Sequence, residues 1–159
     1  MNPVSILRHH PSARAVVRGG AVSGEVRFFQ CERGILVSSE IFGLPHSGKT
    51  CQGGVFAFHI HIGQCDADHP DDPFAQVEGH LNPDNCPHPY HAGDLPPLFA
   101  SRDGYAFQTV LTDRVSLQEI IGKAVIIHAG VDDFTTQPAG DPGIKIACGE
   151  IRPDRKSVV

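Results

Sequence analysis

The sequence has no long apolar run, no excess of basic residues and no C-x-x-C pair. A membrane-spanning helix needs about 20 mostly apolar residues, so we expect no membrane partner. The formal net charge of −5 argues against nucleic acid as a partner and against a polybasic membrane-binding surface. Five cysteines without C-x-x-C spacing argue against a zinc ribbon or a thioredoxin motif, and their odd number leaves at least one thiol free unless it pairs between chains.

The N-terminal segment MNPVSILRHHPSARAVV has neither a long apolar core nor a small-residue cleavage site. It therefore differs from a secretory signal peptide, and we expect the protein in the cytoplasm unless an export signal has been removed. A length of 159 residues fits one domain with a core of its own. We expect residues 1–159 to form that single domain, with a flexible segment at 1–11 and a flexible tail at 152–159.

Apolar residues recur with a period of two along most of the chain, which is typical of strands. The pattern predicts seven strands, at residues 13–18, 25–31, 35–42, 55–62, 105–112, 124–128 and 144–151. The sequence SLQE at 116–119 fits a capping box and predicts one short helical turn. The stretches 64–103 and 129–143 lack periodicity, and loops of that length are usually functional or disordered. We therefore expect an all-β sandwich or barrel with two long functional loops.

The segment FAFHIHIGQC, residues 56–65, places two histidines one residue apart in an apolar run. In a strand, Phe56 and every second residue up to Ile62 share one face, which we expect to be the core. His59 and His61 then lie side by side on the opposite face, with Cα atoms about 6.6 Å apart. Two imidazoles at that distance can bind one metal ion, although an arbitrary H-x-H pair more often lies on a solvated sheet face.

Further candidate ligands occur in GHLNPDNCPHPYHAGDL and VIIHAGVDD. Neutral imidazole is the commonest metal ligand; a neighbouring carboxylate suits zinc, and imidazole-rich sites also suit copper. These segments supply His80, His88, His91, Asp94 and His128. The remaining histidines lie in the N-terminal segment, a turn or the acidic DADHPDD stretch, and we expect no metal role for His9, His10, His46 and His69.

Six motifs together resemble those of the copper/zinc superoxide dismutases, in the same order: FHIH, GHLNP, HAGDLP, DG, IIGKAVIIHAGVDD and GIKIACGEI. The resemblance covers residues 28–151 and rests on the agreement of all six rather than on any one of them. It implies an eight-stranded Greek-key β-sandwich or barrel whose two long loops build the metal site. That architecture agrees with the strands and loops expected from periodicity.

The resemblance also implies a role for individual residues. It assigns copper to His59, His61, His80 and His128. It assigns zinc to His80, His88, His91 and Asp94, so that His80 is a catalytic imidazolate shared by the two metals. Asp132 corresponds to a carboxylate that links copper and zinc ligands, and Cys65 and Cys148 correspond to an intrasubunit disulfide, although Cys148 could equally be a small core residue.

The chain departs from the family pattern in its loops and at one cation. Only two residues separate His88 from His91, so the zinc loop is short. Cys86 could replace His88 as a zinc ligand, pair with Cys51, or do neither. The loop before Cys148 is also shorter than usual. Lys145 stands where the family has an arginine near copper, which keeps the charge but not the fork-shaped donor, and we expect it to act in catalysis by attracting superoxide.

The predicted function is conversion of superoxide to dioxygen and hydrogen peroxide at a redox-cycling copper bridged to a structural zinc. One alternative is a non-catalytic copper- and zinc-binding module with the same fold. A cupin-type metalloenzyme would need a glutamate shortly after the second histidine, and residues 62–68 contain none. A purely structural sandwich would require six coincident motifs. The family allows a homodimer, and the sequence does not decide the oligomeric state.

Overall fold

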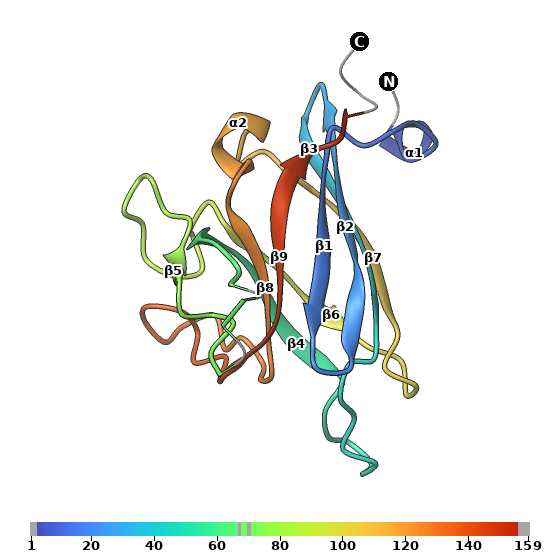
Figure 1. The fold of residues 1–159 in the computed structure, drawn as a ribbon, viewed down its shortest axis with the longest axis vertical. Coiled ribbons are helices and arrows are strands. Elements are labelled where there is room, and N and C mark those ends of the chain that lie inside the picture. Colours follow the sequence, from blue (N-terminus) through green and yellow to red (C-terminus); the bar gives the residue numbers. More distant parts are fainter. Residues whose placement is uncertain (1–2, 67, 70, 156–159) are drawn as a thin grey trace.

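The structure is a computed structural model, and it describes residues 3–66, 68–69 and 71–155 (Figure 1). In chain order the elements are α1 (Pro3–Ile6), β1 (Ala13–Gly19), β2 (Val22–Cys31), β3 (Gly34–Phe42), β4 (Val55–Gly63), β5 (Val77–His80), β6 (Asp94–Phe99), β7 (Ala106–Thr112), α2 (Leu117–Ile120), β8 (Ala124–His128) and β9 (Lys145–Pro153). No helix among the described residues is long and apolar enough to cross a membrane.

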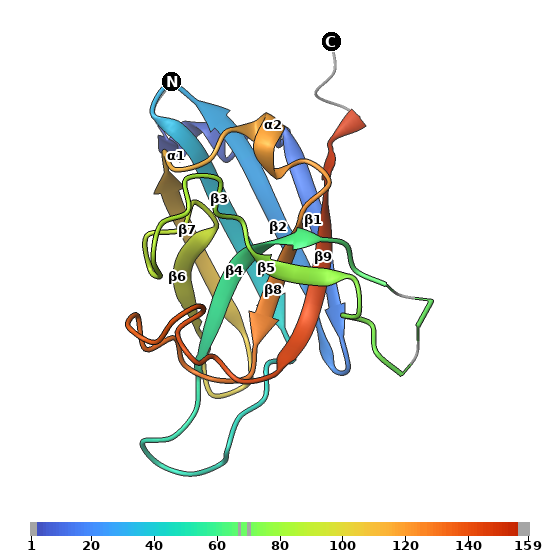
Figure 2. The same cartoon turned by 90° about the vertical axis from the view of Figure 1, so that its left-hand side faces the viewer.

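Within the described residues, nine strands form one sheet in the order β5-β4-β8-β9-β1-β2-β3-β7, and β6 pairs with β4. The sheet curls until β6 lies beside β7 (Figure 2), where the side chain of Gln108 donates a hydrogen bond to the Pro96 carbonyl at 3.1 Å. The consecutive strands β3 and β4 are not sheet neighbours, nor are β7 and β8, and such crossings are typical of a Greek key. The predicted all-β Greek-key class is confirmed.

The seven predicted strands are all present, but β5 and β6 lie within the stretch 64–103 that was expected to be a loop. The sequence of β6, DLPPLF, contains two prolines, which lack the backbone donor that a ladder needs and therefore weaken the strand pattern. β5 has only four residues, VEGH, too few to show a period. The predicted helical turn is confirmed as α2, with Ser116 as N-cap and a capping box to Glu119.

The interior of the curled sheet holds the main hydrophobic core. Different strands contribute its fully buried side chains, among them Phe28, Phe58, Leu98, Ile127 and Ile151. Burying such a side chain contributes about 1.5–3 kcal/mol, so this core accounts for much of the driving force for folding.

Strand β4 places its apolar face in this core as predicted, up to Ile60. The expectation is wrong for Ile62, whose side chain is 38% exposed. The pairing of β4 with β5 shifts register between His61 and Gly63, and this irregularity interrupts the alternation at Ile62.

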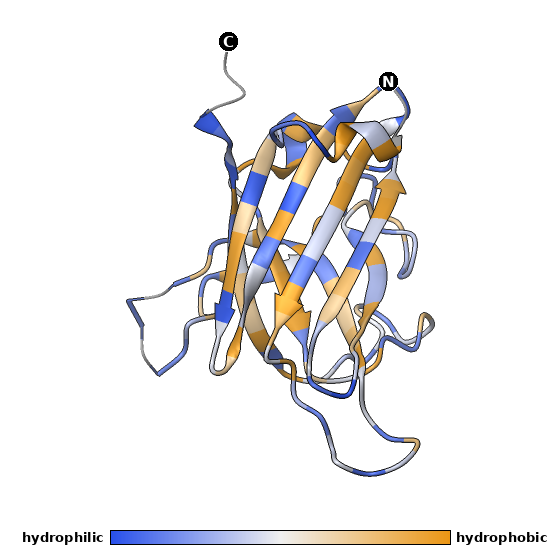
Figure 3. Cartoon of the chain, turned by 90° about the vertical axis from the view of Figure 1, so that its right-hand side faces the viewer, coloured by the Kyte–Doolittle hydropathy of each residue, from blue (hydrophilic) through white to orange (hydrophobic). Residues whose placement is uncertain are grey.

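Hydrophilic and hydrophobic residues alternate along β1, β2, β3 and β7 (Figure 3), as expected for strands with one face toward the core and one toward solvent. Ile6 of α1 packs against Phe29 of β2 and Leu36 of β3 and forms a second, small core. The segments expected to be flexible lie partly outside the described residues. Within the described part, α1 falls in the segment 1–11, and β9 runs on to Pro153.

The connections 81–93 and 129–144 lie side by side, next to β4 and β8 (Figures 1 and 2). Hydrogen bonds join the two connections directly. They cover the face of β4 that points away from the core, and His59 and His61 on that face are buried beneath them.

Candidate metal centre

Four buried histidines from three strands form a group that we call the four-histidine group: His59, His61, His80 and His128. Two come from β4, one ends β5 and one ends β8. β4 lies between the other two strands in the sheet, and His61 pairs with His80 across the ladder. One ligand atom from each residue lies within 4.8 Å of the others.

His61 and His128 direct unprotonated nitrogens at each other. Nδ1 of His61 lies 2.8 Å from the Glu78 carbonyl oxygen, and Nδ1 of His128 lies 3.4 Å from the Gly143 carbonyl oxygen. A carbonyl oxygen only accepts, so each Nδ1 carries a proton and each Nε2 of the neutral ring holds a lone pair. The two Nε2 atoms are 3.2 Å apart. Two facing lone pairs at this distance repel unless a cation lies between them.

The rings of His59, His61 and His128 remain neutral at ordinary pH. Burial lowers the pKa of His61 to about 2. Burial, followed by interactions with His80 and Lys145, lowers the pKa of His128 to about 4. Burial and the neighbouring histidines also lower the pKa of His59 to about 2. These nitrogens therefore do not share a bound proton at ordinary pH, and a metal ion is the cation that their arrangement suits.

The other two members of the group have a free nitrogen each. Nδ1 of His59 and Nε2 of His80 are buried and have no hydrogen-bond partner. Buried polar atoms without a partner are rare and costly, and a missing ion is one of their ordinary explanations. The donor set of four imidazole nitrogens suits copper.

A second group, the histidine–aspartate group, consists of His80, His88, His91 and Asp94. Its ligand atoms also lie within 4.8 Å of one another. Nδ1 of His80 is 2.8 Å from Asp94 Oδ1 and 3.1 Å from His91 Nδ1. Nδ1 of His88 lies 3.0 Å from Asp94 Oδ2 but forms no hydrogen bond. Three histidines and one carboxylate are a donor set that suits tetrahedral zinc.

The charge on Asp94 suits the same role. Burial by itself raises the pKa of the Asp94 carboxyl, but the hydrogen bond from His80 and the interactions with three neighbouring histidines lower it on balance. Asp94 Oδ2 also accepts a hydrogen bond from the backbone N–H of His91 at 3.0 Å. The carboxylate is therefore ionised and held in place, as a metal ligand must be.

His80 belongs to both groups. Its Nδ1 faces the histidine–aspartate group, and its Nε2 is the free nitrogen on the side of the four-histidine group. A deprotonated imidazole has a lone pair on each nitrogen, so this ring can bind two metal ions at once.

Asp132 connects the two groups through a buried carboxylate. Oδ2 accepts a hydrogen bond from His59 Nε2 and Oδ1 accepts one from His88 Nε2, each at 2.7 Å. Because Nε2 carries the proton in both rings, Nδ1 is left as the ligand nitrogen in both. The carboxylate thus fixes the tautomer of one histidine in each group. The family resemblance had led us to expect that Asp132 links a copper ligand to a zinc ligand.

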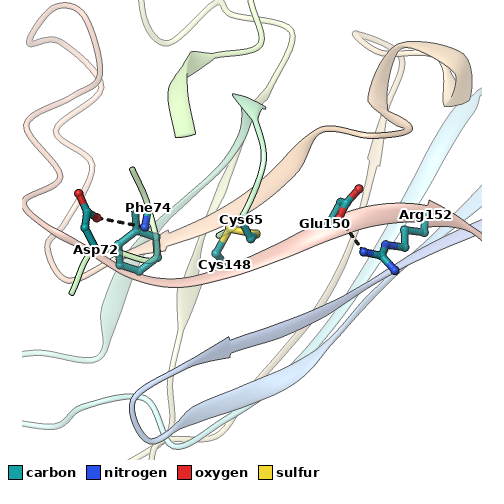
Figure 4. The surroundings of a disulfide bond; sticks show 6 residues. All are labelled: Cys65, Asp72, Phe74, Cys148, Glu150 and Arg152. Atoms are coloured by element: carbon teal, nitrogen blue, oxygen red, sulfur yellow. Dashed lines mark hydrogen bonds and ion pairs between the residues drawn. A yellow bond between two sulfur atoms is a disulfide. The ribbon is translucent and has the colours of Figure 1, made fainter. Parts of the chain in front are cut away.

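A disulfide joins Cys65 and Cys148 and ties the segment after β4 to β9 (Figure 4). This is the pairing expected from the resemblance. Cys51 and Cys86 are both free thiols, so they do not pair with each other. The histidine–aspartate group contains His88 and not Cys86.

Lys145 lies at the start of β9 and pairs with His128 across the ladder. Its side chain is half-buried, and its charge contributes to the lowered pKa of His128. The neighbouring Ile144 is 74% exposed, whereas Ile146 packs against the main core.

The histidines expected to have no metal role are all exposed and belong to neither group: His9, His10, His46 and His69. The sequence interpretation missed the backbone carbonyls of Glu78 and Gly143 and the side chain of Gln137, which bonds to the backbone of His88. Backbone acceptors leave no signal in a sequence, and Gln137 lies 49 residues from His88.

A Greek-key barrel that carries two adjoining imidazole-rich groups with a shared histidine is a protein built for a pair of metal ions. The family model described as copper/zinc superoxide dismutase (SODC) matches residues 22–151. The chain therefore belongs to the copper/zinc superoxide dismutase family.

Curated relatives agree with this assignment. The chain is 33% identical to superoxide dismutase [Cu-Zn] 1 of Aquifex aeolicus over 155 residues, which cover 88% of this chain and 86% of the relative. It is 32% identical to superoxide dismutase [Cu-Zn] of Photobacterium leiognathi, with 84% of this chain and 80% of the relative covered. It is 34% identical to superoxide dismutase [Cu-Zn] of Escherichia coli K12, with the same coverage.

Proposed function

We propose that the chain is a superoxide dismutase that converts superoxide and protons to dioxygen and hydrogen peroxide. The observation that carries this proposal is the convergence of four buried imidazoles, two with Nε2 atoms 3.2 Å apart and two with a ring nitrogen that has no partner, beside a second metal-binding group that shares His80. We assign copper to the four-histidine group because dismutation needs a metal with two accessible oxidation states. We assign zinc, which has no redox step, to the histidine–aspartate group.

A bound copper ion would supply the one-electron oxidation and reduction on which the reaction depends. The role of His80 follows from its placement: Asp94 and His91 hold its Nδ1, and its Nε2 faces the copper ligands. Nε2 of His80 is therefore the atom at which the chain can hold a proton and release it to the product. Asp132 keeps the neighbouring ligand rings in one tautomer while this happens.

The charge distribution assigns a role to Lys145 as well. The protein carries a net charge of −5, and residues 129–144 contain three aspartates and no lysine or arginine. Lys145 follows directly after this loop and lies opposite His128. A cation at this position offsets the repulsion of an anionic substrate near the metal and raises its capture rate.

Location and assembly stay predictions. Disulfides persist in oxidising compartments and are rare in the cytosol, so the Cys65–Cys148 bond argues for an oxidising compartment over the cytoplasm expected from the sequence. A homodimer also stays a prediction, whose measurement is the mass of the protein in solution.

The test combines elemental analysis with a superoxide consumption assay on the same sample. Activity should rise in proportion to copper occupancy. His61→Ala and His128→Ala should abolish activity and copper binding while the β-sheet circular dichroism is retained, because neither ring lies in the main core. His46→Ala is the matched control, since His46 is exposed and should change nothing. Copper-loaded protein without turnover would instead identify a non-catalytic metal-binding module.

A further inference from the structure

The side-chain amide of Gln137 forms a pair of hydrogen bonds with the backbone of one residue, His88. The backbone N–H of His88 donates to Gln137 Oε1 at 2.8 Å, and Gln137 Nε2 donates to the His88 carbonyl at 2.8 Å. The remaining N–H of Nε2 donates to the Thr135 carbonyl at 3.1 Å within its own loop. The amide thus pairs with His88 much as a neighbouring strand would.

His88 needs support from outside its own loop. Only two residues separate it from His91, and its ring nitrogen Nδ1 makes no hydrogen bond. The other ring nitrogen, Nε2, is held by Asp132 at 2.7 Å. Gln137 and Asp132 both belong to the loop 129–144, so this second loop holds His88 at its backbone and at its ring tip.

The glycine at position 140 shows how closely this loop packs on the ring. A Cβ atom at Gly140 would lie 2.7 Å from His88 Nε2 and 2.1 Å from Asp132 Oδ1, distances that side-chain carbons do not adopt. The backbone of Gly140 therefore closes over the hydrogen bond between Asp132 and His88. Its N–H is itself fixed by the Thr136 carbonyl at 2.7 Å.

Fixing both ends of His88 determines where its free nitrogen points. With the backbone held by Gln137 and Nε2 held by Asp132, Nδ1 is directed at Asp94, 3.0 Å away. We propose that Gln137 is a positioning residue for the histidine–aspartate group: it holds the backbone of His88 so that Nδ1 is presented to zinc, and it thereby sets the zinc affinity. This inference rests on the zinc assignment made above.

The expected effect is selective for one metal. Gln137 makes no hydrogen bond to any member of the four-histidine group. Its loss frees the backbone of His88 and leaves the copper ligands in place. Partners that orient a metal ligand are typically worth about 10- to 100-fold in metal affinity, so Gln137→Leu should weaken zinc binding by about that factor and leave copper binding unchanged.

The test uses the full chain and three variants. Zinc affinity is measured on metal-free protein by competition with a chromophoric chelator, after the wild type has been shown to bind zinc. Gln137→Glu keeps the acceptor for the His88 N–H but loses the donor to its carbonyl, so its affinity should fall between those of the wild type and Gln137→Leu. Gln30→Leu is the matched control, because it also removes side-chain hydrogen bonds to backbone carbonyls, here those of Cys31 and Gly34, in the β2–β3 hairpin, which contains no member of either metal group.

A second readout separates positioning from general destabilisation. Co²⁺ replaces zinc as a probe, and its visible absorption at saturation reports the ligand geometry. Gln137→Leu should change this spectrum, whereas Gln30→Leu should not. Wild-type zinc affinity and an unchanged cobalt spectrum in Gln137→Leu would overturn the proposal. Parallel losses of zinc and copper with a lower melting temperature of the metal-free protein would overturn it too, and a wild type that binds no zinc would overturn the zinc assignment itself.

Discussion

At the scale of single residues, one carboxylate controls the proton positions in both metal groups. Asp132 accepts a hydrogen bond from His59 with one oxygen and from His88 with the other. Each bond places the proton of a ligand ring on Nε2 and leaves Nδ1 for a metal. The side chain is buried, so water cannot replace it.

Asp132→Asn should therefore weaken metal binding although it changes only one atom. An amide has one acceptor oxygen, so its NH₂ group must face one of the two rings. That ring then has to accept at Nε2 and carry its proton on Nδ1, which blocks the ligand nitrogen. The affinity of at least one metal should fall by about 10- to 100-fold, measured by chelator competition. Asp133→Asn is the control, because Asp133 is exposed and an amide oxygen can still accept from its backbone partners. Unchanged affinity for both metals in Asp132→Asn would exclude tautomer control.

At the scale of elements, the disulfide fixes the segment after β4 to β9 (Figure 4). Cys65 and Cys148 are separated by 83 residues, so their bond removes much of the freedom of the unfolded chain. The loop-closure relation gives about 4.5 kcal/mol for a loop of this size. For a chain of this length, that corresponds to a thermal midpoint higher by about 9–18 °C.

The double variant Cys65→Ser/Cys148→Ala should lower the thermal midpoint of the metal-free protein by that amount. Calorimetry on metal-free samples excludes a contribution from metal loss. Cys51→Ser is the control, since Cys51 is an exposed free thiol and its replacement should leave the midpoint unchanged. Peptide mapping without reductant should recover the two half-cystines as one joined fragment. Free thiols at both positions in air-exposed protein would refute the bond.

Elements with a clear period could be predicted from the sequence, and elements without one could not. β8, AVIIH, is apolar up to its final histidine, and β3 carries a clear strand pattern. The positions of both strands were predicted to within a residue. β6 carries two prolines and β5 is too short, so both were assigned to a loop. Both strands form by pairing with β4, a tertiary contact that the local sequence does not reveal.

The candidate site shows the same division. The H-x-H pair on β4 was found from strand alternation alone, because it lies on a regular element. The members of the histidine–aspartate group lie in or beside an irregular loop; residue type made them candidate ligands, and only the family resemblance assigned them to zinc. Gln137 could not be found either way, since its role comes from contact between two loops far apart in the chain.

At the scale of the whole molecule, the buried histidines make the metal-free protein sensitive to acid. The pKa of His61 is about 2 and that of His128 about 4 in the folded state, both below the ordinary 6.5. Between pH 6.5 and 5 the unfolded chain therefore binds protons that the folded chain does not. The free energy of unfolding must fall as the pH is lowered through this window, by up to about 1.4 kcal/mol per pH unit for each ring.

Denaturant titrations of metal-free protein at several pH values measure this slope. His61→Gln removes one of the rings, so its slope should be shallower by up to about 1.4 kcal/mol per pH unit. His46→Gln is the control with an exposed ring and should keep the wild-type slope. A stability that is flat from pH 6.5 to 5 would show that the site histidines are not held neutral.

Net charge and local charge oppose each other in this protein, and we propose that Lys145 sets the local charge that a superoxide ion meets near the metal. The chain as a whole carries −5, whereas Lys145 lies opposite His128 at the edge of the four-histidine group. Opposite charges at contact distance attract by about 1 kcal/mol in water and more where water is excluded. Lys145→Glu should therefore lower the second-order rate of superoxide consumption by about tenfold or more, and Lys145→Arg should preserve or raise it.

Two comparisons separate the local effect of Lys145 from the effect of net charge: a change in ionic strength, and a substitution at the distant Lys49. Raising the ionic strength should slow the wild type, because it screens the attraction, and should leave Lys145→Glu unchanged or faster. Lys49→Glu changes the net charge equally, but Lys49 is exposed in the loop between β3 and β4, so its rate should stay near that of the wild type. Stopped-flow measurements on samples matched for copper content make the comparison. A wild-type rate and salt dependence in Lys145→Glu would mean that Lys145 has no part in attracting the substrate.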